Sequence, residues 1–90
     1  MSVKIHLPPY LQPFANNTEV FEVKGSTVGE CLDYLLEQSP DIVNKLFNKR
    51  GKLHGYVAIY LNGEDAYPDE LVRSLKDGDE LHILYIIGGG

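Results

Sequence analysis

The feature that most constrains the fold is a single capped amphipathic helix at residues 27–38. Thr27 is followed three residues later by Glu30, and in such a capping box each side chain can bind a free backbone N–H near the first turn. The apolar residues recur at helical spacing, while the acidic residues fall on the opposite face. A helix of this kind buries its apolar stripe against another layer. The stripe consists of Val28, Cys31, Leu32, Leu35 and Leu36.

Alternating apolar residues predict strands that would supply this second layer. Residues 3–7 and 19–23 predict two strands joined by a longer loop, and residues 56–61 and 80–87 predict two more. Asn62-Gly63 predicts a tight turn before a short edge strand at residues 65–67. Pro40 ends the main helix and opens a shorter one. The order predicts an α+β domain with a mixed sheet of four to five strands, one main helix packed across it and a short second helix.

Length and charge narrow the possible functions. Ninety residues suffice for one domain, which we place at residues 1–87, followed by a tail at residues 88–90. The net charge of −5 argues against binding to nucleic acid or to an anionic membrane. Cys31 is the only cysteine, so an internal disulfide is excluded. Without an apolar run of ~20 residues or a signal peptide, we expect a cytoplasmic protein.

The tail Gly88-Gly89-Gly90 is the feature most informative about function. Ordering a glycine costs roughly 1–2 kcal/mol of backbone entropy, so these residues add nothing to stability. They would instead form a thin, flexible thread that can enter a narrow channel and present a carboxylate at its tip. The alternative is a frayed terminus without a function.

Several segments together resemble the MoaD/ThiS family of sulfur carriers over essentially the whole chain. They are the first strand, the capped helix, the sequence LNGED at residues 61–65, the sequence LKDGDEL at residues 75–81, and the terminal glycines. The combination of the DGDE turn with a terminal Gly-Gly is the more specific part. The resemblance implies a ubiquitin-like β-grasp fold.

The resemblance also implies a mechanism in which the protein is a co-substrate and not an enzyme. A ubiquitin-activating-type enzyme would use ATP to adenylate the terminal carboxylate, and a sulfur donor would convert it to a thiocarboxylate. The protein itself would bind no cofactor. Members of the family usually end in one Gly-Gly pair after a small residue, so Gly88 would fill the small position and Gly89-Gly90 would be the functional pair. If Gly88-Gly89 were the pair, Gly90 would have to be trimmed.

The last strand predicts a docking face for the partner enzymes. Leu81, Ile83 and Tyr85 share the face that would pack on the helix, which leaves Leu84 and Ile86 on the open face beside His82. Exposed apolar patches often mark contacts with protein partners, and by resemblance the position of Leu84 lies in the activating-enzyme contact. The alternative is scattered surface residues or a patch covered by the loop at residues 10–14. The candidate docking residues are Tyr60, Leu84, Ile86, Ile87 and Gly88, with Ala58 beside them.

Other groups that could carry chemistry have simpler explanations. His6 and His82 could lie side by side, but no further ligands stand at the spacing of a metal site. Cys31 lies on the apolar stripe and is expected in the core. A turn explains the three acidic residues Asp77, Asp79 and Glu80. The basic residues Lys45, Lys49, Arg50 and Lys52 are expected to form a solvated loop.

Three functions remain open from the sequence: a sulfur carrier, a protein modifier that forms amide bonds through the same tail, and a plain interaction domain. For the carrier, the sulfur-accepting synthase could serve cysteine or homocysteine, molybdopterin or thiamine synthesis. The stretch at residues 51–65 resembles the cysteine-type carriers most, with the small subunit of molybdopterin synthase as the runner-up. Thiamine-type members are usually shorter and lack the loop at residues 45–55.

Overall fold

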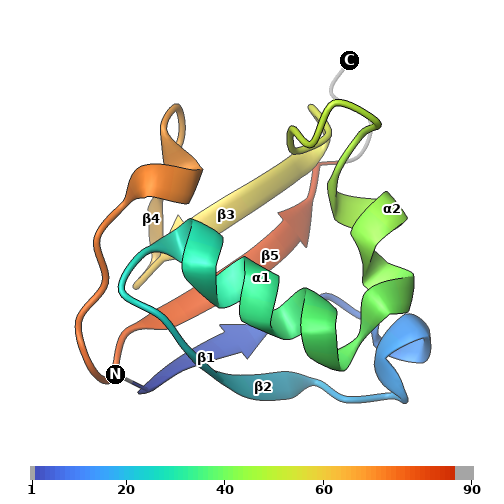
Figure 1. Ribbon diagram of the computed structural model, residues 1–90, viewed down its shortest axis with the longest axis horizontal. Helices are drawn as coiled ribbons and strands as arrows, with labels where there is room; N and C mark the ends of the chain where they lie inside the picture. Colours follow the sequence, from blue (N-terminus) through green and yellow to red (C-terminus); the bar gives the residue numbers. More distant parts are fainter. Residues whose placement is uncertain (1, 87–90) are drawn as a thin grey trace.

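Five strands form one mixed sheet in the order β2-β1-β5-β3-β4 (Figure 1). The computed structural model describes residues 2–86. The central strands β1 and β5 run parallel, and every other neighbouring pair is antiparallel. The expected mixed sheet is therefore confirmed, with the first and last strands side by side. The strands are β1 (Ser2–His6), β2 (Val20–Lys24), β3 (Val57–Leu61), β4 (Glu64–Asp65) and β5 (Glu80–Tyr85).

The main helix α1 (Val28–Gln38) crosses one face of this sheet (Figure 1). The side chain of Thr27 accepts a hydrogen bond from the Glu30 N–H at 3.2 Å, as predicted. The Glu30 carboxylate, however, accepts from the backbone N–H and the hydroxyl of Ser26, both at 2.8 Å, one residue earlier than in a capping box. Both bonds favour the charged form of the Glu30 carboxyl group and so lower the pKa of Glu30, and the bond from the Ser26 backbone has the larger effect.

Short helical elements complete the helical layer. The 3₁₀ turn η2 (Pro40–Ile42) leads into α2 (Val43–Leu46), which confirms the second helix after Pro40. Two further 3₁₀ turns are present: η1 (Gln12–Ala15) lies in the connection that was predicted as a loop, and η3 (Glu70–Val72) lies in a segment for which no element was predicted. Contacts run from η3 to α1, from α1 to η2, and from η2 to both α2 and η1, so these elements form one connected layer.

Two predicted strand boundaries need correction. The edge strand lies at Glu64–Asp65 and not at residues 65–67. Asn62 and Gly63 both have positive φ (51° and 89°), so the chain reverses within two residues and Glu64 pairs directly with Leu61. Strand β5 ends at Tyr85, although the Ile86 N–H still donates to the Tyr56 carbonyl at 2.8 Å.

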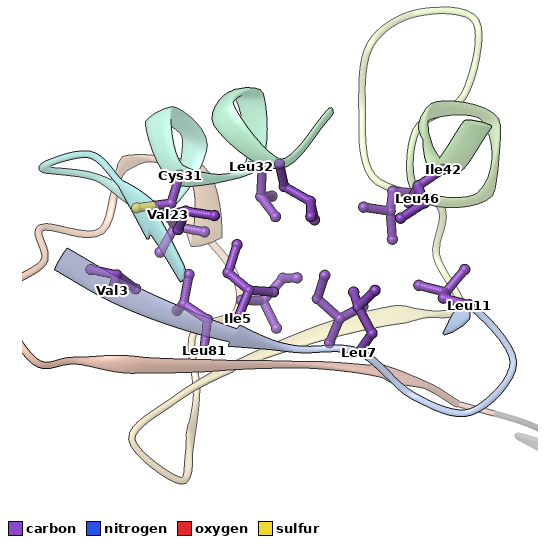
Figure 2. Packing of buried hydrophobic residues seen from close by; sticks show 14 of the residues in the cluster. Val3, Ile5, Leu7, Leu11, Val23, Cys31, Leu32, Ile42, Leu46 and Leu81 are labelled. Carbon is purple, nitrogen blue, oxygen red and sulfur yellow. The ribbon is translucent and has the colours of Figure 1, made fainter. Parts of the chain in front are cut away.

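The core fills the space between the sheet and the helical layer (Figure 2). Strands β1, β3 and β5 contribute their inward faces, and α1 contributes its predicted stripe, including the fully buried Cys31. Ile42 and Leu46 of the η2–α2 segment close one end together with Leu11 (Figure 2). Among residues 2–86 no helix is long and apolar enough to cross a membrane.

Candidate docking face and the end of the last strand

The face of the sheet opposite α1 carries the predicted docking residues. Leu81 and Ile83 are buried against the helical layer and Tyr85 is half-buried, as predicted. The alternate residues Leu84 and Ile86 are 41% and 55% exposed. Both are therefore available to a partner, which is what a docking role requires.

Neighbouring strands extend this open face. In the β3–β5 register Tyr60 pairs with His82 and Ala58 pairs with Leu84. Tyr60 is half-buried, but Ala58 is only 6% exposed. A methyl group reaches less far from the sheet than the side chains of Leu84 and Tyr60, so Ala58 is not part of the exposed patch, and the prediction that it would join the patch was wrong. The apolar part of the face is thus formed by Leu84 and Ile86, with Tyr60 beside them.

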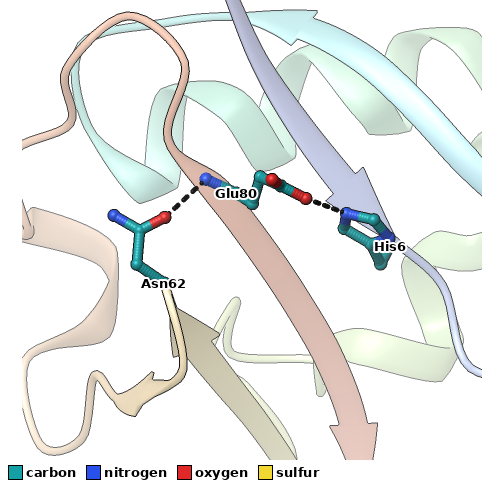
Figure 3. A network of polar contacts seen from close by, with 3 residues as sticks. All are labelled: His6, Asn62 and Glu80. Atoms are coloured by element: carbon teal, nitrogen blue, oxygen red, sulfur yellow. Dashed lines mark hydrogen bonds and ion pairs between the residues drawn. The ribbon is translucent and has the colours of Figure 1, made fainter.

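The other part of the open face is polar. His6 and His82 are paired across β1 and β5, and their rings stack with centroids 4.1 Å apart, which confirms that they lie side by side. His6 Nε2 lies 2.6 Å from Glu80 Oε1, and the Glu80 N–H donates to Asn62 Oδ1 at 2.9 Å (Figure 3). Among residues 2–86 no group of three His, Cys, Asp or Glu side chains is placed to hold a metal ion.

The turn that feeds β5 is tied to the turn after β3. Asp79 accepts hydrogen bonds from the Lys76 N–H at 2.8 Å and from the Asn62 side chain at 3.0 Å. Both bonds lower the pKa of Asp79, and the bond from the Lys76 N–H has the larger effect. These contacts confirm that Asp79 serves the turn. The assignment of Glu80 to the turn was wrong, because Glu80 is the first residue of β5 and its carboxylate contacts His6 across the sheet.

At the far end of β5, four aromatic residues gather where the chain leaves the sheet. Tyr85 lies between Tyr10 and Tyr56, with ring centroids 5.0 and 5.4 Å away, and Phe14 lies beside Tyr10. The Tyr85 hydroxyl donates to the Lys45 carbonyl of α2 at 2.7 Å. Desolvation, followed by the neighbouring Tyr56 and Tyr10, raises the pKa of Tyr85 to about 12. We call Tyr10, Phe14, Tyr56 and Tyr85 the aromatic cluster.

Sequence reasoning missed this cluster and misplaced Lys45. Lys45 belongs to α2 and not to a solvated loop, and its ammonium lies 4.6 Å from the centre of the Phe14 ring and 5.9 Å from that of Tyr10. Cation–π contacts of this kind favour the observed position. The three apolar side chains of the loop at residues 10–14 were the available signal, but the contact with α2 depends on tertiary packing.

The candidate residues Ile87, Gly88, Gly89 and Gly90 lie outside the described residues. One hollow, of about 310 Å³, is lined by Lys52, Leu53 and residues 68–72, and another, of about 240 Å³, is lined by Ser2, Lys4, Asp77, Gly78 and Glu80. The candidate docking residues Leu84 and Ile86 line neither hollow and form an exposed apolar patch on the open face of the sheet.

These features define the class of ubiquitin-like β-grasp proteins that includes the CysO, ThiS and MoaD sulfur carriers. A sheet with parallel central strands holds one long helix on one face and leaves the other face open. Within that class, the chain belongs to the ThiS family, whose model matches residues 5–90.

Individual relatives agree with this assignment. The sulfur carrier protein CysO of Mycobacterium tuberculosis is 31% identical over the full length of both chains. CysO in the crystal structure of the BexX/CysO complex of Amycolatopsis orientalis superposes with a TM-score of 0.87 at 32% identity, covering 98% of this chain and 99% of the other. The crystal structure of SAMP1 from Haloferax volcanii gives a TM-score of 0.87 at 28% identity, covering all of both chains.

Proposed function

We propose that this chain is a sulfur carrier whose Gly90 carboxylate is activated and converted to a thiocarboxylate. The observation that carries the proposal is the match to the ThiS family, which continues to residue 90 and so includes Gly89-Gly90. The full-length similarity to a sulfur carrier protein supports the same reading. Strand β5 ends beside an exposed apolar patch, so a partner bound to that patch would also lie close to the C-terminal segment.

The chemistry requires two steps at the same carboxyl group, the first at a carboxylate oxygen and the second at the acyl carbon. A carboxylate resists attack because an oxide ion would have to leave. In the first step a carboxylate oxygen attacks the α-phosphorus of ATP, which releases pyrophosphate and leaves an acyl-adenylate. In the second step a sulfide or persulfide sulfur attacks the acyl carbon, and AMP departs with the former carboxylate oxygen. A persulfide donor must then release its outer sulfur by reductive cleavage of the S–S bond with a thiol.

The proposal assigns the catalytic groups to partner enzymes and the docking face to this chain. An adenylating enzyme of the ubiquitin-activating type would bind ATP and contact Tyr60, Leu84 and Ile86, with Ile87 and Gly88 entering its channel. A small-residue tail suits such a channel because Gly has no side chain to exclude. The chain itself would bind no cofactor.

The proposed acceptor is a synthase of the cysteine or homocysteine type. The similarity to CysO over the whole chain supports this choice, and in Amycolatopsis orientalis a CysO forms a complex with BexX. The runner-up is the role of small subunit of a molybdopterin synthase, which the sequence resemblance left open. A stable complex with a larger catalytic subunit would distinguish this role.

A second candidate function is protein modification through the same terminus. The likeness to SAMP1 of Haloferax volcanii, a small archaeal modifier protein, favours it. Both functions begin with adenylation, and they differ in whether sulfide or a lysine amine attacks the acyl carbon. Covalent adducts with other proteins, absent when Gly90 is deleted, would reveal the second function.

Deletion of Gly90 tests the proposal. We expect it to abolish ATP–pyrophosphate exchange by the adenylating enzyme of the source organism, because the carboxylate would stop one residue short of the α-phosphate. Gly88→Ala is the matched control, since a small residue is expected at this position, and should retain exchange within a few-fold. Retained exchange after the deletion would contradict the assignment to Gly90. If the wild type binds partners but never supports exchange, the chain is an interaction domain.

A further inference from the structure

The point at which the chain leaves the sheet is held by one side chain. Tyr85 is the last residue of β5, where it pairs with Val57, and the Ile86 N–H donates to the Tyr56 carbonyl, the last such bond within residues 2–86. Gly90 follows Tyr85 by five residues, so its Cα can lie at most roughly 18 Å from that of Tyr85. The position of Tyr85 therefore limits where the terminal carboxylate can be.

The Tyr85 side chain connects the end of β5 to α2. Its hydroxyl donates to the Lys45 carbonyl at 2.7 Å, across 40 residues of sequence. The last carbonyls of a helix lack partners within the helix, and no backbone N–H among residues 2–86 donates to this one. The hydroxyl thus satisfies a free acceptor, while Tyr10 and Tyr56 hold the ring from two sides.

We propose that Tyr85 is a positioning residue for the terminal carboxylate, because its bond to α2 fixes the place from which residues 87–90 leave the domain. The claim that Tyr85 affects activation of the carboxylate rests on the proposed function. The claim that Tyr85 holds the end of β5 does not. Burial of the Tyr85 side chain, and after it the neighbouring Tyr56 and Tyr10, raises the pKa of Tyr85 to about 12. The hydroxyl is therefore protonated, and a hydrogen-bond donor, at neutral pH.

The consequence for activation follows from the few residues between Tyr85 and Gly90. Strand ends open locally when few contacts hold them. If the end of β5 opened, the segment beyond the sheet would lengthen by about two residues and sample more conformations. A smaller fraction of docked complexes would then hold the carboxylate in line with the α-phosphate, and such misplacement lowers rate more than binding.

The test compares Tyr85→Phe with Tyr10→Phe. Both variants lose one hydroxyl from the same cluster and keep the ring, but the Tyr10 hydroxyl makes no hydrogen bond within residues 2–86. The first readout is amide hydrogen exchange in the free protein at Ile86, with Ile83 in the middle of β5 as the internal reference. The second is ATP–pyrophosphate exchange at varied carrier concentration, which separates kcat from KM.

For Tyr85→Phe we expect exchange at Ile86 to accelerate by roughly 3–10-fold, as for loss of one hydrogen bond, while Ile83 stays unchanged. The kcat should fall by no more than this factor, because the closed fraction of the strand end cannot fall by more than its opening rises, with KM within about twofold, and Tyr10→Phe should alter neither. Unchanged amide hydrogen exchange at Ile86 would overturn the proposal. Faster hydrogen exchange at Ile86 would also overturn it if kcat stayed unchanged or if only KM changed. A wild type that is never adenylated would refute the proposed function and the activation part, and exchange at Ile86 would still decide the structural part.

Discussion

At the scale of single residues, Gly25 shows how closely the chain entering α1 approaches the helix. A Cβ atom at this position would lie 2.9 Å from Cys31 N, from Cys31 Sγ and from Glu30 Cβ. Cys31 N and Glu30 Cβ belong to the first turn of the helix, and the buried Cys31 sulfur belongs to the core, so none of the three atoms can move freely. Glycine is needed here for space.

Gly25→Ala should therefore destabilise the domain by roughly 1–3 kcal/mol, the usual cost of overpacking. Gly55→Ala is the matched control, because a Cβ there would meet nothing within 4 Å. We expect the control to change stability by no more than about 0.5 kcal/mol. Urea unfolding followed by circular dichroism measures both values. Equal stability of the two variants would show that the chain adjusts at Gly25 without cost.

At the scale of elements, the turn before β5 and the turn after β3 are joined by Asp79. Its carboxylate accepts from Lys76 and Asn62, while the Asn62 side-chain carbonyl accepts from the Glu80 N–H. Two turns far apart in sequence are thus held at the same end of the central strands. The hydrogen bonds favour the charged carboxylate and lower the pKa of Asp79 from its ordinary value of 3.8.

This lowered pKa predicts a loss of stability in acid. A group whose pKa is lower in the folded state than in the unfolded state stabilises the folded state. This stabilisation is complete above the unfolded-state pKa and is lost as pH falls through the folded-state pKa. The wild type should exceed Asp79→Asn in unfolding free energy at pH 7, and the difference should shrink as pH falls below about 3.8. Urea unfolding across this range measures it. Asp33→Asn is the control: the Asp33 side chain makes no hydrogen bond within residues 2–86, so this change should lower the unfolding free energy at pH 7 by less.

The elements also show how far sequence reasoning reaches in this protein. The cap at Thr27, the alternation of Val3 and Ile5, and the turn at Asn62-Gly63 are local signals, and the elements they predict are present. The exposure of Leu84 followed from the same alternation. The contact between Tyr85 and Lys45 joins segments 40 residues apart and depends on how α2 packs, so no local pattern announced it.

At the scale of the whole molecule, the open face of the sheet combines a polar part with an apolar part. His6, Glu80 and His82 form the polar part, and Leu84 and Ile86 form the apolar part next to the end of β5. A partner seated on the apolar part would be placed beside the C-terminal segment. Under the proposed function, docking and delivery of the carboxylate would therefore take place at one end of the sheet.

Leu84→Asp tests this arrangement. Leu84 is 41% exposed, so the change should affect folding little, but a buried unpaired charge in the contact should weaken binding to the adenylating enzyme at least about tenfold. Val72→Asp is the control, because Val72 is 72% exposed on η3, which packs against α1 on the other side of the sheet. Isothermal titration calorimetry gives both affinities. Equal binding by the two variants would place the contact elsewhere.

The central claim concerns the chemical state of Gly90, and the intact mass of the protein tests it most directly. The protein is incubated with ATP, heavy-isotope sulfide and the adenylating enzyme of its source organism, then digested to isolate the C-terminal peptide. Oxidation of Met1 or Cys31 by one oxygen atom raises the nominal mass as much as replacement of oxygen by ordinary sulfur. The heavy isotope and the position of the modified peptide distinguish the two modifications. We predict one heavy sulfur in place of one oxygen, confined to the peptide that ends in Gly90. An unchanged C-terminal peptide with no ATP consumed would contradict the assignment of this chain as a sulfur carrier.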